Sequence, residues 1–223
     1  MPIKYKMEVP KMSNTTVLTG LGVSPGIGIG KSIILKRENI IIPKAKACDV
    51  SKEKYRFLEA LESVKNETKS MIANSKNSFN KTKIDILNAY LMIIDDKKIS
   101  SEIIHLIEEK QLNAESAVNN GFNIIIKNFE LIESEYIKER AFDLLDIRDR
   151  LLRKLMNIKI KNISNLNKDT IIITKDFTLS DSLQLDFSSV NGIVSQIGGK
   201  NSHASIIARS LEIPSIFNVK NAL

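Results

Sequence analysis

The sequence has no tryptophan, one cysteine (Cys48) and two histidines (His105 and His203) in 223 residues. A single cysteine forms no internal disulfide, which is typical of proteins in a reducing cytoplasm. We interpret Cys48 as a small core or boundary residue, because neither histidine lies near it in sequence to activate a thiol. The two histidines are far apart, without the HxxxH or CxxC spacings of metal sites, so no metal is expected.

Long apolar runs are also missing. None reaches the roughly 18–20 residues needed to span a bilayer, and no apolar segment follows the basic N-terminus as in a secretory signal. Aromatic residues make up only 5% of the chain, so single-stranded nucleic acid would find few stacking platforms. We therefore expect a cytoplasmic protein that binds neither membrane nor nucleic acid.

Negative charge is scarce only at the N-terminus. The formal net charge is +7, and residues 1–48 carry eight lysines and arginines against two acidic residues, whereas the rest of the chain is nearly balanced. A charge excess confined to one end is more typical of a solvated tail than of a nucleic-acid surface. We interpret residues 1–15 as a flexible basic leader.

Helix-breaking residues are rare in the middle of the chain. Only Gly121 lies between Gly30 and Gly192, and no proline lies between Pro43 and Pro214. Apolar residues recur there with the 3.6-residue period of amphipathic helices. Residues 49–161 are therefore predicted to form an antiparallel helical bundle. The expected helices cover about 57–72, 82–94, 100–110, a segment from Asn113 past Gly121, and 133–155.

Both ends have a different pattern. β-branched runs surround a glycine-rich loop near residues 17–36, and further strands are predicted at 169–174 and 190–199. Short helices are predicted at 179–187 and 203–211. This alternation indicates one α/β unit made of residues 16–48 and 162–223, with the bundle inserted into it.

The glycine-rich stretch "PGIGIGKS", residues 25–32, nearly matches a phosphate-binding P-loop. Pro25 occupies the first glycine position, and the residues after Ser32 favour a strand, whereas a P-loop must open a helix. A tight turn between strands is therefore the simpler interpretation. His105 lies among isoleucines in a predicted helix and is interpreted as a bundle residue.

His203 lies in "GGKNSHAS", just after a predicted strand and at the start of a predicted helix. Asn201 and Ser202 are good N-cap residues, and the helix dipole would favour an anion on the histidine ring. A neutral imidazole is a nucleophile without a separate base. The residues alone leave two interpretations open: a helix-capping histidine or a carrier of a phosphoryl group.

"GGKNSHASIIARSLEIPSI" resembles the phosphohistidine signature G-G-x-T-S-H-x-[SA]-I-x-A-R of phosphoenolpyruvate-utilising enzymes. The stretches "GVSPGIGIGKSIIL", "EYIKERAFDLLDIRDRLLRKL" and "DFTLSDSLQL" are similar, in this order, to segments of Enzyme I of the bacterial sugar phosphotransferase system. The resemblance covers nearly all of residues 17–217. It implies an α/β swivelling phosphohistidine domain with an inserted all-α helical subdomain. Asn201 departs from the signature, where a threonine is usual.

The resemblance implies that His203 takes a phosphoryl group from phosphoenolpyruvate and passes it to the carrier protein HPr. Ser182 would hydrogen-bond the histidine, and Ser202, Gly198 and Gly199 would shape its loop. Arg209 matches the motif arginine, with a structural role and phosphate contact both open. The bundle would bind HPr through Ile86, Tyr90, Ile93, Ile94, Asp96 and Arg140, although the apolar members of this set also fit a bundle core.

Family members continue into a barrel that binds phosphoenolpyruvate and Mg(II) and forms a homodimer. The sequence ends before that barrel, so we expect a monomer that needs no cofactor and exchanges phosphoryl groups with phospho-HPr but does not phosphorylate itself. Two alternatives are a swivelling domain of a dikinase or phosphoenolpyruvate synthase-like enzyme, and a non-catalytic docking module.

Overall fold

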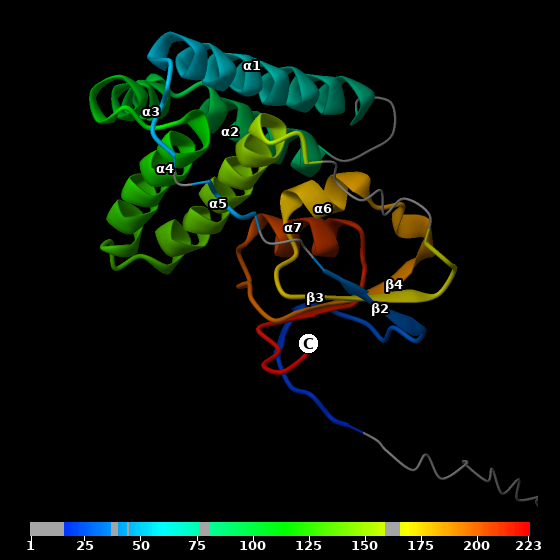
Figure 1. Ribbon diagram of the computed structural model, residues 1–223. Helices are drawn as coiled ribbons and strands as arrows, with labels where there is room; N and C mark the ends of the chain where they lie inside the picture. The colour runs from blue at the N-terminus through cyan, green and yellow to red at the C-terminus, as the bar shows by residue number, and fades with distance from the viewer. Residues whose placement is uncertain (1–15, 37–39, 44, 76–80, 159–165) are drawn as a thin grey trace, which may run out of the picture.

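Five helices follow one another between the second and third strands of a small sheet (Figure 1). The computed structural model describes residues 16–36, 40–43, 45–75, 81–158 and 166–223. The helices are α1 (Val50–Ser75), α2 (Lys81–Ile94), α3 (Lys97–Lys110), α4 (Ala114–Glu130) and α5 (Glu135–Leu155). The whole bundle thus forms one crossover connection, as the sequence predicts. The proposed leader, residues 1–15, lies outside the described residues.

Side-chain caps and apolar stripes explain the bundle. The Asp96 carboxylate accepts the N–H of Lys98 at 2.7 Å and starts α3, and Asn113 starts α4 by accepting the N–H of Ser116 at 3.1 Å. Capping of this kind stabilises a helix by about 1 kcal/mol. The apolar faces meet in one core whose fully buried side chains include Phe57, Leu87, Ile107 and Ile147.

The sheet has five strands in the order β1-β5-β4-β3-β2. They are β1 (Leu21–Ser24), β2 (Lys31–Leu35), β3 (Thr170–Thr174), β4 (Val190–Ser195) and β5 (Ser215–Phe217). The pairs from β2 to β5 are parallel, and β1 runs antiparallel to β5. Two short helices, α6 (Leu179–Gln184) and α7 (His203–Ser210), connect parallel strands and lie between the sheet and the bundle (Figure 1).

The glycine-rich loop leads into a strand, as the tight-turn interpretation predicts, and does not open the helix that a P-loop requires. Lys31 begins β2, and its N–H donates to the Asp169 carbonyl at 2.9 Å. At Gly30 a Cβ atom would lie 1.9 Å from that same carbonyl oxygen. The glycine is therefore required by the close approach of two backbones in a tight turn.

Two apolar cores meet at α6 and α7. Leu179 of α6 and Ile207 of α7 belong to the core of the bundle, whereas Ile172 and Phe217 belong to the core of the sheet. α7 packs in both directions, because its Ala204 belongs to the core of the sheet, and α6 packs beside it. This arrangement, a helical subdomain on an α/β subdomain, confirms the predicted fold class.

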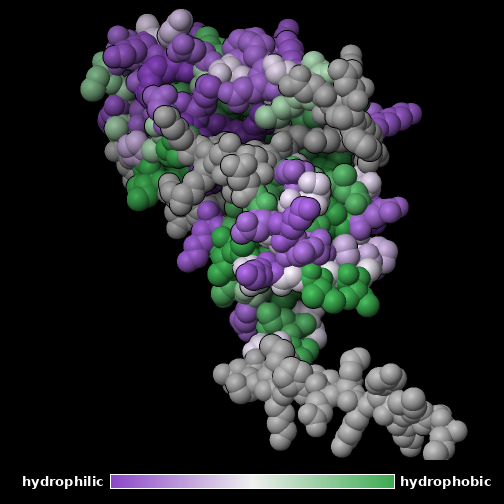
Figure 2. All heavy atoms as spheres, turned by 90° about the vertical axis from the view of Figure 1, so that its right-hand side faces the viewer, coloured by the Kyte–Doolittle hydropathy of each residue, from purple (hydrophilic) through white to green (hydrophobic). Residues whose placement is uncertain are grey.

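The surface differs between the two subdomains. In Figure 2 hydrophilic side chains cover most of the helical part, and apolar side chains gather over the part that contains the sheet. The exposed apolar residues there include Ile27, Ile29 and Ile34. Cys48 is exposed, so its assignment as a core or boundary residue is wrong. None of the helices in the described part of the chain is long and apolar enough to cross a bilayer.

Candidate active site

The loop after β4 holds His203 at the first residue of α7. Ser202 caps the helix by accepting the N–H of Ser205 at 3.2 Å, and the hydroxyls of both serines donate to the Gly199 carbonyl, at 3.1 and 2.6 Å. Gly198 has a φ of 124°, a conformation that side chains disfavour. The loop therefore has a fixed shape that orients the histidine.

His203 is buried between the two subdomains, with 6% of its surface exposed. Its Nδ1 lies 2.9 Å from Oδ1 of Asp143 on α5. The ring of Tyr90 on α2 packs against it at a tilt of 50°, with 5.8 Å between ring centroids. The bundle therefore supplies two of the groups that surround a histidine of the α/β subdomain.

The contact with Asp143 indicates which nitrogen of His203 carries the ring proton. A carboxylate accepts a hydrogen bond, so Nδ1 carries the proton and donates it toward Asp143. The lone pair of the neutral ring then resides on Nε2. The helix end on which His203 stands carries partial positive charge, which stabilises an anion bound to the ring. This arrangement suits a histidine that accepts an anionic group on Nε2.

Asp143 belongs to a buried polar network that the sequence analysis missed. The Tyr90 hydroxyl lies 3.4 Å from Oδ1 of Asp143 and 3.4 Å from Oδ2 of Asp146. Burial, together with the negative charges of Asp146 and Asp143, raises the pKa of Tyr90 well above its ordinary range, and the nearby Arg150 cation opposes this shift. Tyr90 is therefore a neutral donor toward two carboxylates.

The sequence contained a signal for this network. Asp143, Asp146 and Arg150 follow one another at spacings of three and four residues, the same spacing as the buried Leu144, Ile147 and Leu151 of α5. Three charged residues with helical periodicity on one face are unusual when that face borders a core, because buried charges require partners.

Ser182 does not occupy the place expected of it. Its hydroxyl donates to the Leu179 carbonyl at 2.7 Å, within its own helix. Thr178, four residues earlier, lines the same small pocket as His203 and caps α6 together with Asp181 in a capping box. The threonine position of the "DFTLSDS" motif, rather than its last serine, therefore faces the histidine pocket.

Arg209 has a structural contact. Its Nη1 donates to the Lys200 carbonyl at 2.8 Å and to the Val23 carbonyl at 3.3 Å. The guanidinium therefore ties the loop before α7 to the end of β1. Of the two roles left open by the sequence, the structure supports the structural one.

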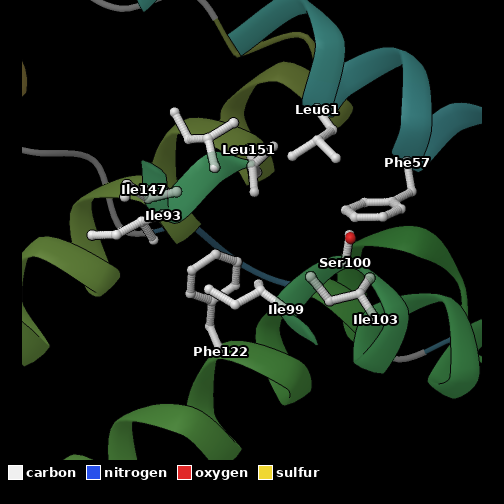
Figure 3. Close-up of a pocket in the computed structure, with 10 residues that line it drawn as sticks. Phe57, Leu61, Ile93, Ile99, Ser100, Ile103, Phe122, Ile147 and Leu151 are labelled. Carbon is white, nitrogen blue, oxygen red and sulfur yellow. The ribbon is translucent and has the colours of Figure 1, made fainter. Parts of the chain in front are cut away.

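The apolar residues expected to bind HPr are mostly core residues. Ile86, Tyr90 and Ile94 are buried in this structure, so their side chains belong to the core here, and their role in HPr binding stays a prediction. Ile93 points into a small apolar pocket inside the bundle (Figure 3). The spacing of these residues on α2 fits both a docking face and a core face, and in the structure their side chains pack in the core. Asp96 is exposed at the start of α3, and the side chain of Arg140 lies outside the described residues.

The bundle pocket in Figure 3 is a packing gap rather than a ligand site. Its lining side chains come from all five helices and are apolar, apart from Ser100. The Ser100 hydroxyl donates to the carbonyls of Asp96 and Lys97 at 3.3 and 3.2 Å. Within the described residues, no group of three or more His, Cys, Asp or Glu side chains is placed to hold a metal ion.

Two family models match this chain. Residues 19–140 match the one described as "PEP-utilising enzyme, N-terminal", and residues 166–223 match "PEP-utilising enzyme, mobile domain". The phosphoenolpyruvate-protein phosphotransferases of Buchnera aphidicola (subspecies Baizongia pistaciae) and Bacillus subtilis are 35% and 34% identical to it. Each alignment covers 92% of this chain and 36% of the relative, so the chain spans about a third of the length of these relatives.

Solved structures agree with the sequence comparisons. An Enzyme I protein studied by solution NMR superposes with a TM-score of 0.71 at 33% identity, over 92% of this chain and 84% of that one. The N-terminal domain of a nitrogen-type Enzyme 1 has a TM-score of 0.59 at 23% identity and shares the fold. One family model thus covers more than half of the residues of this chain, and an Enzyme I structure matches most of the chain. The chain therefore belongs to the phosphoenolpyruvate-utilising enzymes, in the Enzyme I family.

Proposed function

We propose that His203 carries a phosphoryl group between phosphoenolpyruvate and the carrier protein HPr. The observation that supports this most directly is the imidazole at the start of α7 whose Nδ1 faces the Asp143 carboxylate at 2.9 Å. This contact places the ring proton on Nδ1, so the lone pair that attacks phosphorus is on Nε2, and the helix dipole favours a bound anion. Acyl transfer would instead need a paired nucleophile such as serine or cysteine.

The reaction consists of two phosphoryl transfers. In the first, Nε2 of His203 forms a bond to phosphorus as the bond from phosphorus to the enol oxygen breaks; the oxygen leaves with the electron pair, and the released enolate takes up a proton at carbon to become pyruvate. In the second, a histidine nitrogen of HPr attacks the same phosphorus and the bond to Nε2 breaks. Asp143 stabilises the Nδ1–H of the ring, which gains positive charge while Nε2 bears the phosphoryl group.

The comparisons favour this reaction over that of a dikinase, because the matched relatives are named phosphoenolpyruvate-protein phosphotransferases. Since the chain spans 36% of these relatives, we place the phosphoenolpyruvate site, its Mg(II) and the dimer contacts in the region of the relatives that this chain does not cover. The chain itself would then exchange phosphoryl groups with phospho-HPr, as expected from the sequence.

HPr would dock on the exposed side of the bundle. Met92 lies on α2 and is 76% exposed, and the Asp96 carboxylate is exposed at the start of α3. An exposed apolar side chain four positions before an exposed acidic one suits a partner whose surface is apolar and basic. We propose Met92 and Asp96 as contact residues in place of the buried residues of α2.

Phosphotransfer from labelled phospho-HPr tests the proposal, and the chain provides its own matched control. His105 is the other histidine and is exposed on α3. We expect His203→Ala to remove an acid-labile, base-stable label, and His105→Ala to take up label like the parent. Equal labelling of both variants would refute the role of His203. Phosphoenolpyruvate alone should label neither the parent nor the His105 variant.

A further inference from the structure

The burial of His203 makes opening of the subdomain interface necessary. At 6% exposure, between Tyr90 and Asp143, its ring meets a donor molecule only if the α/β subdomain moves relative to the bundle. Residues 166–223 also match the family model described as a mobile domain. This requirement rests on the proposed function of His203. The movement breaks the contacts that hold the two subdomains together in this structure.

Asp146 makes a polar contact across this interface. Its Oδ2 accepts the hydroxyl of Ser180 at 2.8 Å and the backbone N–H of Ser180 at 3.3 Å. Asp146 belongs to α5 of the bundle and Ser180 to α6 of the α/β subdomain, so this contact exists only while the two are docked. Asp146 is 4% exposed. It also lies 3.4 Å from the Tyr90 hydroxyl of the bundle, but loss of the two Ser180 donors removes hydrogen bonds to a charged group, which favours a donor that takes their place.

Arg150 is placed to be that replacement. It lies four residues after Asp146 on α5, a spacing at which carboxylate and guanidinium side chains reach each other. Its side chain is 8% exposed, and its Nη2 donates to the Thr68 hydroxyl at 3.1 Å. Its Nη1 is buried and has no hydrogen-bond partner among the described residues. Both Asp146 and Arg150 act on the pKa of Tyr90, so both charges lie near the same hydroxyl.

We propose that Asp146 exchanges partners: it holds Ser180 while the α/β subdomain is docked and pairs with Arg150 when that subdomain moves away. In the docked state the cost is an unsatisfied guanidinium N–H, and in the undocked state the lost serine contacts are compensated by an ion pair. Each state leaves little buried polarity unpaired, so this exchange by itself favours neither state strongly. Asp146 and Arg150 are positioning residues in this scheme, since they control access to His203 without touching it.

The docked and undocked populations are measurable with two spin labels on the whole chain. One label goes on the exposed Cys48, beside the bundle, and the other on Lys31→Cys at the exposed start of β2. Pulsed electron resonance then gives the distribution of distances between the subdomains. Ser180→Ala removes a hydrogen bond to a charged group, which shifts an equilibrium constant about tenfold or more, here toward the undocked state.

Arg150→Met is the decisive variant, because it should act in the opposite direction. It removes the unsatisfied donor of the docked state and the partner of the undocked state, so the undocked fraction should fall below that of the parent. Arg150→Gln should give the same decrease if the methionine variant does not fold. Arg148→Met is the matched control: this arginine is on the same helix, pairs with Asp149 at 2.7 Å, and its removal should leave the distribution unchanged.

A rise or no change in the undocked fraction on removal of Arg150 would overturn the exchange, as would an unchanged distribution in Ser180→Ala. These distances are measured on the unphosphorylated chain. If His203 proved inactive in phosphotransfer, the distance shifts would still be expected, so failure of the proposed function and failure of this inference give different results.

Discussion

Replacement of Asp143 by asparagine tests the chemistry of the site without a change of side-chain shape. The amide oxygen of asparagine can still accept the Nδ1–H of His203, now 2.9 Å from Oδ1, but the negative charge is lost. A hydrogen bond to a charged group stabilises by about 1.5–3 kcal/mol and a neutral one by about 0.5–1.5 kcal/mol. The difference of roughly 1–1.5 kcal/mol corresponds to a rate decrease of about tenfold.

The decrease should appear in rapid-quench measurements of phosphoryl transfer from phospho-HPr to the chain. Asp149→Asn is the control, because Asp149 lies on the same helix but pairs with Arg148 at the partly exposed surface. Unfolding by denaturant shows whether each variant is folded. If folded Asp143→Asn accepts phosphate as fast as the parent and as Asp149→Asn, then the Asp143 charge does not assist the reaction and the role given to it is wrong.

Three further predictions concern stability. The pKa of Tyr90 is raised in the folded protein, so the unfolded chain loses that proton first, and the free energy of unfolding should fall as the pH rises above about 10, by up to roughly 1.4 kcal/mol per pH unit. Denaturant titrations of Tyr90→Phe at several pH values should lack this part of the pH dependence. Those of Tyr55→Phe, which replaces a tyrosine that is 67% exposed, should keep it. Gly198→Ala should lower the free energy of unfolding by at least about 1 kcal/mol, because alanine disfavours a φ of 124°, and a thermal midpoint equal to that of the parent would contradict this reason. Thr178→Val should cost about 1 kcal/mol by removing the cap of α6, and calorimetry showing a larger loss in Ser182→Ala would reverse the assignment of these two positions.

The sequence predicts the local features of this fold well. Helical periodicity, the N-cap at Asn113 and the change to β-branched runs at both ends depend on neighbouring residues, and all three are present in the structure. The position of His203 at the start of a helix is of the same kind, because Ser202 and the glycines before it are local signals.

Contacts between residues that lie far apart along the chain could not be predicted from the sequence. Asp143 and His203 are separated by sixty positions, and no local pattern states that α5 faces α7. The apolar face of α2 could equally serve a core or a partner, and only packing shows that Tyr90 is buried. Thr178 was missed for a different reason: the capping threonine and Ser182 belong to one short motif, and their roles depend on which turn of α6 faces the histidine.

The insertion of the whole bundle between β2 and β3 has a consequence for folding. Leu35 and Thr174 end two neighbouring parallel strands, yet all five bundle helices separate these residues in the chain. Closing so long a loop costs conformational entropy before any strand contact is gained. A bundle that folds first shortens the effective loop, because it brings the segments before α1 and after α5 near each other. The helices would thus act as a folding nucleus for the sheet, and the first two strands would wait unpaired during synthesis until β3 to β5 emerge.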